Sequence, residues 1–95
     1  MPSYTAPLRD MRFVIEQVLQ APASWAACPA LADMDANTAL QVLEEAARFA
    51  SDVLAPTNAP GDLAGCTLQA GEVRTPPGYR EAYRAFIDGG WPALP

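Results

Sequence analysis

The sequence predicts a mainly α-helical chain. We expect a small helical bundle, with helices over about residues 8–20, 38–54 and 77–88, and one short β-hairpin over about residues 66–74. Two observations predict this fold class. Apolar residues recur at three- and four-residue spacing in three separate stretches, which is typical of amphipathic helices. Gly71 lies between two short runs, CTL and EVR, and such a position favours a hairpin turn.

The first predicted helix follows an extended arm over residues 1–7. Pro7 suits the first turn of a helix, where its missing N–H is not needed. Ala21-Pro22 ends the helix, because the residue before a proline is pushed out of the α region. One apolar stripe runs along it and is widened by two further side chains: Leu8, Met11, Val14 or Ile15, Val18, with Phe13 and Leu19.

Residues 22–36 form a predicted connector, and Trp25 is its large side chain. Trp25 could be a stacking platform for a ligand. We interpret it instead as an anchor that pins the connector to the helices. Asp33 and Asp35 could suggest a metal site, but calcium needs more oxygen ligands at fixed spacing. Asp35 or Asn37 is better explained as the cap of the next helix.

The central predicted helix begins near Asn37 and is stopped by Pro56. Glu44 and Glu45 could be proposed as an acid–base pair, but neighbours on a helix point about 100° apart and do not converge on one substrate. We expect both on a solvated face, with Glu44 paired to Arg48 at i, i+4 spacing. The predicted buried face is rich in alanine, which lets another helix approach closely: Leu40, Leu43, Ala46 or Ala47, Ala50, and Val53 or Leu54.

Residues 57–65 read as turns, and the hairpin that follows should lean on the helices, because a lone hairpin is marginally stable. Gly71 is placed for the positive φ of the hairpin turn. No glycine pattern matches a phosphate-binding loop.

The last predicted helix opens at Thr75, a plausible cap, and Pro76 or Pro77 fits its first turn. Gly89 is the expected left-handed residue at its end, after which Trp91 and Leu94 should fold back on the helix. Four aromatic residues could line a ligand cleft, although helical spacing favours a core role: Tyr79, Tyr83, Phe86 and Trp91.

Composition restricts the function classes. The chain has 95 residues, a net charge of −5, 51% hydrophobic and 18% charged residues. This balance disfavours nucleic acids and anionic membranes as partners, since both need clustered Lys and Arg. No apolar run reaches the length of about 20 residues needed to span a membrane. No signal peptide is recognisable, and Cys28 and Cys66 form no metal motif, so we expect a cytoplasmic chain with reduced thiols.

Three stretches together resemble the N-terminal part of the flavin-dependent acyl-CoA dehydrogenases, in the bacterial branch with an extra N-terminal segment. They are YTAPLRDMRFVIEQVL (residues 4–19), LEEAARFASDVLAPTN (43–58) and GDLAGCTLQAGEVRTPPGYREAYRAFIDGGWPAL (61–94). The resemblance implies that residues 1–36 form an N-terminal extension helix and connector. It also implies that residues 37–95 are part of the N-terminal helical domain of the family and end before its β-domain.

Members of this family are similar in removing two hydrogens from Cα and Cβ of an acyl-CoA thioester, with a glutamate base and FAD as hydride acceptor. The resemblance implies FAD in the parent enzyme, an electron-transfer flavoprotein as electron acceptor, and a homo-oligomer. It places no catalytic, cofactor-binding or metal-binding residue in this chain, so the chain alone should be inactive and bind no FAD. Its expected role is structural, as one wall of the acyl pocket, together with the remainder of the enzyme or a companion subunit.

Two other interpretations remain open. One is a non-enzymatic helical module that self-associates through its alanine-rich faces. The other is a small-ligand binder that uses Trp25 or Trp91. The central helix should pack on the first and last helices and leave apolar surface for other partners.

Overall fold

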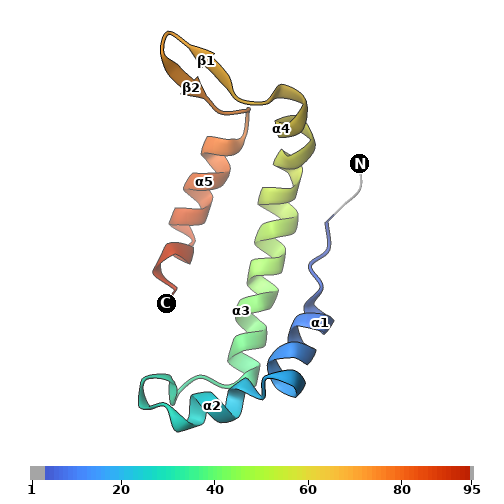
Figure 1. The fold of residues 1–95 in the computed structure, drawn as a ribbon, viewed down its shortest axis with the longest axis vertical. Coiled ribbons are helices and arrows are strands. Elements are labelled where there is room, and N and C mark those ends of the chain that lie inside the picture. Colours follow the sequence, from blue (N-terminus) through green and yellow to red (C-terminus); the bar gives the residue numbers. More distant parts are fainter. Residues whose placement is uncertain (1–3, 95) are drawn as a thin grey trace. The chain divides into compact units, whose positions relative to one another are not determined.

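The computed structural model describes residues 4–94, which form two compact units, residues 4–49 and residues 50–94. It confirms a helical chain with one two-stranded antiparallel hairpin (Figure 1). The predicted arm lies partly outside the described residues, and residues 4–7 have no regular secondary structure.

The first unit opens with α1 (Leu8–Phe13), which continues as a π-helical turn over Val14–Val18. Together they form the helix predicted over residues 8–20. Gln20 then adopts a left-handed conformation with φ 50° and ψ 42°, which interrupts the helical path. The break therefore lies one residue before the Ala21-Pro22 pair that the sequence indicated.

The predicted connector over residues 22–36 is wrong in part, because much of it is helical. It contains α2 (Ala21–Ala27) and a 3₁₀ turn over Pro29–Leu31. Pro22 occupies the first turn of α2, where a proline loses no hydrogen bond. The sequence interpretation treated Pro22 only as a helix end, although proline is equally suited to a helix start.

Helix α3 (Ala36–Phe49) is the longest of the first unit. The Thr38 backbone N–H donates to Asp35 Oδ1 at 2.7 Å, and the Ala39 N–H donates to the Asp35 carbonyl at 3.0 Å. Asp35 is thus the N-cap residue, one of the two caps that the sequence allowed. Arg48 pairs with Glu45 at i, i+3 spacing; the pair of Glu44 with Arg48 stays a prediction.

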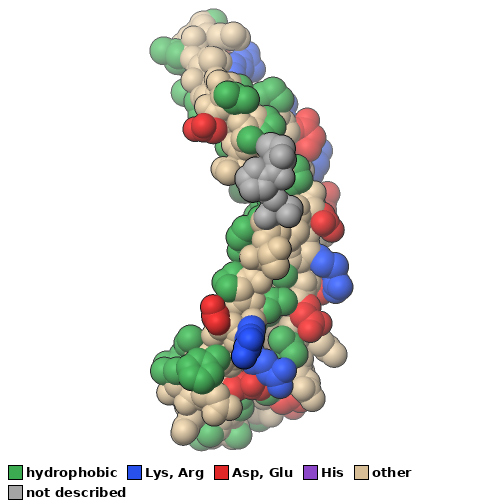
Figure 2. Space-filling model, turned by 90° about the vertical axis from the view of Figure 1, so that its right-hand side faces the viewer, with side chains coloured by type: hydrophobic (Ala, Val, Ile, Leu, Met, Phe, Trp, Pro, Cys, Tyr) green, Lys and Arg blue, Asp and Glu red, His purple; other side chains and the backbone are tan. Residues whose placement is uncertain are grey.

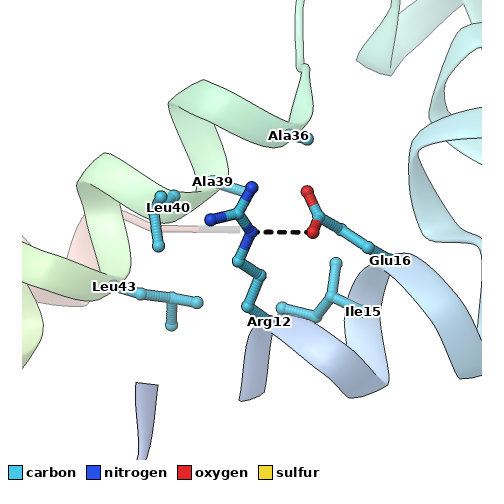
Figure 3. A pocket seen from close by; sticks show the side chains of 7 residues that line it. All are labelled: Arg12, Ile15, Glu16, Ala36, Ala39, Leu40 and Leu43. Carbon is cyan, nitrogen blue, oxygen red and sulfur yellow. Dashed lines mark hydrogen bonds and ion pairs between the residues drawn. The ribbon is translucent and has the colours of Figure 1, made fainter. Parts of the chain in front are cut away.

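Helix α1 packs on α3 through a small polar and apolar contact (Figure 3). Arg12 Nε donates to Glu16 Oε2 at 2.8 Å, and both side chains border the same small cavity as Leu40 and Leu43. The arginine stem covers apolar surface while its charged end is held by the acid. This ion pair spans one helical turn and holds the Arg12 side chain over α3.

The second unit begins with a π-helical turn over Ala50–Leu54 and a 3₁₀ turn over Ala55–Thr57, which lead into α4 (Asn58–Ala64). Residues 57–65 were predicted as turns, and that prediction is wrong for α4. Pro56 and Pro60 both lie in first turns, where they are tolerated. Gly65, with φ 63° and ψ 178°, ends the helical path instead.

Strands β1 (Thr67–Gln69) and β2 (Glu72–Arg74) pair antiparallel, with Leu68 opposite Val73. The two turn residues, Ala70 and Gly71, have φ of 52° and 80°. This two-residue turn confirms the predicted hairpin and the role of Gly71. Every strand residue is exposed, so the expectation that the hairpin leans on the helices is wrong.

Helix α5 (Tyr79–Asp88) follows a turn in which the Tyr79 N–H donates to the Pro76 carbonyl at 3.3 Å. Gly78, in the left-handed region with φ 91°, precedes the helix, so Thr75 is not its cap. At the other end, Gly89 keeps a right-handed φ of −74° and Gly90 takes the left-handed conformation with φ 81°. The predicted left-handed residue is therefore displaced by one position.

Burial is slight in both units. Within residues 4–94 the buried positions are Gly61, Pro76 and Ala82, all in the second unit. The predicted face of the central helix is half-buried rather than buried, and Leu54 is 44% exposed. Hydrophobic side chains lie open to solvent between the acids and arginines (Figure 2). The predicted central helix corresponds to α3 in the first unit and to Ala50–Leu54 in the second. Helix α3 contacts α1, and Ala50–Leu54 contacts α5, so both predicted packing contacts are present.

Candidate functional site

The strongest candidate site is an apolar groove in the second unit, beside α5. It is open, has a volume of about 240 Å³, and exposes mostly apolar surface. Ala50–Leu54 and Ala55–Thr57 supply one wall, and α5 supplies the other. We call it the α5 groove, and it is lined by Leu54, Thr57, Tyr79, Ala82, Tyr83 and Phe86.

Helical spacing places the α5 residues of the groove on one face. Tyr79, Ala82, Tyr83 and Phe86 follow one another at i, i+3, i+4 and i+7, so their side chains share a stripe. Ala82 is 8% exposed and forms the floor, whereas Tyr83 is 66% exposed at the rim. The small alanine leaves the space that the larger side chains surround.

Two aromatic rings shape the rim of the groove. The rings of Tyr83 and Phe86 stack with centroids 6.4 Å apart and an interplanar angle of 23°. Such stacked pairs contribute about 0.5–1.5 kcal/mol beyond the area that they bury. The pair therefore limits the rotation of both side chains and presents a fixed apolar surface.

A close helix contact sets the position of Tyr79. A Cβ atom at Gly61 would lie 2.8 Å from Cε1 and Cζ of the Tyr79 ring, so α4 approaches this ring through a residue without a side chain. On the other wall, the Thr57 hydroxyl donates to the Leu54 carbonyl at 2.6 Å. The polar atom of Thr57 is thus engaged with backbone, and the wall of the groove stays apolar.

The aromatic set singled out from the sequence is brought together in part. Tyr79, Tyr83 and Phe86 line the α5 groove, and Trp91 does not. A core role was expected, but Tyr79 and Tyr83 are both exposed. Trp91 lies half-buried over Gly89, where a Cβ atom would be 3.0 Å from its ring. It therefore folds back as predicted, while Leu94 stays 54% exposed.

Sequence reasoning did not identify Thr57 and Gly61 as parts of this region. Both lie in the stretch that was interpreted as turns, so their helical phase was not considered. The available signal was Pro56, at the second position of the 3₁₀ turn, and Pro60, at the third position of α4, since a proline is tolerated in the first turn of a helix.

The other candidate residues remain apart from the groove. Trp25 is half-buried on α2, in a helix rather than a loop. Glu44 and Glu45 are both exposed on α3, as expected for a solvated face. Within residues 4–94 no group of three or more His, Cys, Asp or Glu side chains is arranged to hold a metal ion. Cys28 and Cys66 are free thiols, half-buried and exposed respectively.

The pKa of Asp35 is displaced from its ordinary value. The backbone N–H of Thr38, followed by the side chain of Thr38, donates to its carboxylate and lowers the pKa of Asp35 below the ordinary 3.8. A hydrogen-bonded, ionised carboxylate at the start of α3 has an evident capping role. It is not part of the α5 groove.

The described helices include none that is long and apolar enough to cross a membrane. No family model matches the chain. Along 97% of its length, however, the chain is similar to the 3-methylmercaptopropionyl-CoA dehydrogenase of Ruegeria pomeroyi, with 38% identity over 92 residues. The chain spans 16% of the length of that protein. The similarity confirms the resemblance to acyl-CoA dehydrogenases drawn from the sequence.

Proposed function

We propose that the chain is an N-terminal helical part of a flavin-dependent acyl-CoA dehydrogenase, in which it has a structural role and helps to wall the acyl side of the pocket. In such an enzyme two hydrogens leave Cα and Cβ of an acyl-CoA thioester. The observation that carries this proposal is 38% identity over nearly the whole chain. The exposed apolar residues of both units support it, because such surface is usually covered by further protein.

The described residues do not fit FAD by themselves. The common dinucleotide-binding motif is a glycine-rich turn that presents backbone N–H groups to the diphosphate at a helix N-terminus. Here Gly61 is packed against Tyr79, Gly65 ends α4, and Gly71 forms the hairpin turn. The α5 groove is apolar and small. We therefore assign neither flavin contacts nor a catalytic base to this chain, and place both in the rest of the proposed enzyme.

The proposal includes the partners expected for the whole enzyme. FAD is its cofactor, and an electron-transfer flavoprotein takes the electrons. The enzyme is a homo-oligomer in the cytoplasm, and residues 1–36 form its N-terminal extension while residues 37–95 belong to its helical domain. The Ruegeria protein acts, by its name, on 3-methylmercaptopropionyl-CoA, and an acyl-CoA of this kind is the first substrate to test.

A complementation experiment tests the structural role. The Ruegeria enzyme is produced without the 92 matched residues, alone and together with this chain. We expect the chain to co-purify with the truncated enzyme and to restore flavin absorbance and acyl-CoA-dependent dye reduction. The chain alone should show neither. A chain that reduces dye by itself would contradict the assignment of catalysis to the rest of the enzyme.

The same preparation separates the alternative, a self-associating helical module. Sedimentation of the chain alone measures its oligomeric state. A stable oligomer of the chain that does not bind the truncated enzyme would favour the module. The half-buried, alanine-containing face of α3 is compatible with such self-association.

A further inference from the structure

Two surfaces adjoin along α5 in the second unit. One is the α5 groove. The other, which we call the arginine ledge, is an open surface lined by Arg80, Tyr83, Arg84, Ile87 and Asp88. Tyr83 borders both surfaces. Since Arg80 and Arg84 are four residues apart, their side chains leave α5 on the same side.

The two arginines of the ledge have no carboxylate partner among the described residues. Glu81 and Asp88 share the helix with them, yet the ion pairs among the described residues involve neither Arg80 nor Arg84. By contrast, three other arginines each pair with a glutamate two to four residues away. In a chain of net charge −5, an unpaired arginine pair beside an apolar groove is a local positive site.

We propose that the α5 groove and the arginine ledge together bind an acidic amphipathic helix of a protein partner. Apolar side chains of that helix enter the groove, and its carboxylates meet Arg80 and Arg84. This inference rests on the structural role proposed above, to which it adds the chemistry of the packing partner.

Three features favour this occupant. The groove is open and holds about 240 Å³, which suits a few side chains from one helix face. Tyrosine and arginine are the residue types enriched at the energetic centres of protein interfaces. The guanidinium group binds a carboxylate through two parallel hydrogen bonds, so the ledge selects acids over neutral side chains.

Other anions fit this surface less well. Nucleic acids and anionic membranes attract extended basic surfaces, whereas this chain carries more acids than bases. An isolated phosphate would use the ledge but leave the apolar groove open to water. A protein helix satisfies both surfaces at once.

The test uses the full chain and two synthetic helical peptides. Both carry Leu at i, i+3, i+4 and i+7, and they differ only in Glu or Lys at the flanking positions. We expect the Glu peptide to bind about tenfold more tightly in titration calorimetry, the effect of two exposed charge pairs together with like-charge repulsion of the Lys peptide. This preference should shrink at high ionic strength, because salt screens exposed charges.

Charge reversal tests the ledge. The double variant R80E/R84E should prefer the Lys peptide, and Arg9→Glu, a charge reversal in the first unit, should keep the preference for the Glu peptide. Because Arg80 and Arg84 are exposed, helix content should not change. The single variants Arg80→Gln and Arg84→Gln give the same test with a smaller charge change, and each should weaken the preference.

Truncation tests the groove. Tyr83→Ala should weaken binding of both peptides several-fold, because it removes the side chain shared by the two surfaces. Leu63→Ala is the matched apolar control, since Leu63 is 87% exposed and does not line the groove. Equal loss with both variants would overturn the assignment to this groove.

Three outcomes would overturn the inference: no binding, equal binding of both peptides, or self-association that R80E/R84E abolishes. The last would assign the surface to a second copy of the chain. Failure of the structural role is seen separately, because complementation of the truncated enzyme does not depend on these peptides. Complementation without peptide preference refutes this inference alone. Peptide preference without complementation refutes the proposed enzyme role.

Discussion

Ala70 shares with Gln20 a left-handed backbone conformation that is unusual for a residue with a side chain. Its φ of 52° is left-handed, and it is followed by Gly71 at φ 80°. A two-residue hairpin turn of this kind requires positive φ at both positions. A residue with a Cβ atom loses about 1–2 kcal/mol in this conformation, whereas glycine loses little. The hairpin thus keeps one unfavourable residue at its turn.

Ala70→Gly and Ala70→Asn should both stabilise the hairpin. We expect its opening free energy to rise by about 1 kcal/mol, since Asn-Gly and Gly-Gly are the residue pairs that this turn favours. Amide hydrogen exchange at Leu68 and Val73 measures the effect directly. Gly71→Ala should change exchange in the opposite direction, and an unchanged rate in all three variants would show that the turn is not strained.

The lowered pKa of Asp35 predicts that the stability of the start of α3 depends on pH. Because its pKa is lowered in the folded chain, its stabilising effect is present above the ordinary value of 3.8 and is lost as pH falls through the lower, folded value. Asp35→Asn keeps a capping oxygen but should remove this acidic loss of helix content. Asp35→Ala should reduce helix content at neutral pH as well. Circular dichroism against pH distinguishes the three chains.

At the scale of single residues, some of these conformations could be predicted from the sequence and others could not. The cap at Asp35 was predictable, because aspartate before an apolar period has a direct local role. The positive φ of Gly71 was predictable for the same reason. That of Ala70 was not, because alanine gives no sign of it. Gly90, and not the predicted Gly89, is the left-handed residue after α5. Either of two adjacent glycines can take this conformation, so the sequence does not show at which one the last helical turn ends.

At the scale of elements, α4 and α5 meet through Gly61 and Tyr79. Gly61→Ala should lower the free energy of unfolding by about 1–3 kcal/mol, because the new methyl group would overlap the Tyr79 ring and must displace it. Urea unfolding measures the loss. In a Tyr79→Phe background the loss should be smaller, because the hydroxyl that lies nearest to the new methyl group is absent. A loss equal in both backgrounds would place the cost elsewhere.

The elements also show why helices at proline-rich stretches were missed. Pro22 and Pro56 were interpreted as helix stops and Pro60 as part of a turn, but each lies in the first turn of a helical element. A proline prevents the preceding helix from continuing and, in the same position, starts the next one. The sequence signal is the same in both cases, so only the backbone path decides between a helix end and a change of helix direction.

At the scale of the whole molecule, the lack of buried apolar side chains predicts weak stability. Ala82 is the buried hydrophobic residue of the described chain, while Phe13, Val18, Leu19 and Leu63 are each more than half exposed. We expect the isolated chain to unfold over a broad range of urea with a low slope, because little surface is hidden in the folded state. It should also bind the dye ANS at neutral pH.

A steep, cooperative transition without ANS binding would show that the chain covers its own apolar surface by association. Adding the truncated Ruegeria enzyme should sharpen the transition, because a partner that binds only the folded chain stabilises it.

The α5 groove could be predicted only in part from the sequence. Helical spacing grouped Tyr79, Tyr83 and Phe86, but the same pattern describes a core, and the burial of these side chains depends on what packs there.

The two free thiols have a practical consequence. Cys66 is exposed in the unit of residues 50–94, and Cys28 is half-buried in the unit of residues 4–49. Cys66 should therefore react first with a limiting amount of maleimide, and Cys28 can be labelled afterwards with a second fluorophore. Energy transfer between these two dyes can then be measured before and after the truncated enzyme is added. A chain without engineered cysteines would thus report its own docking.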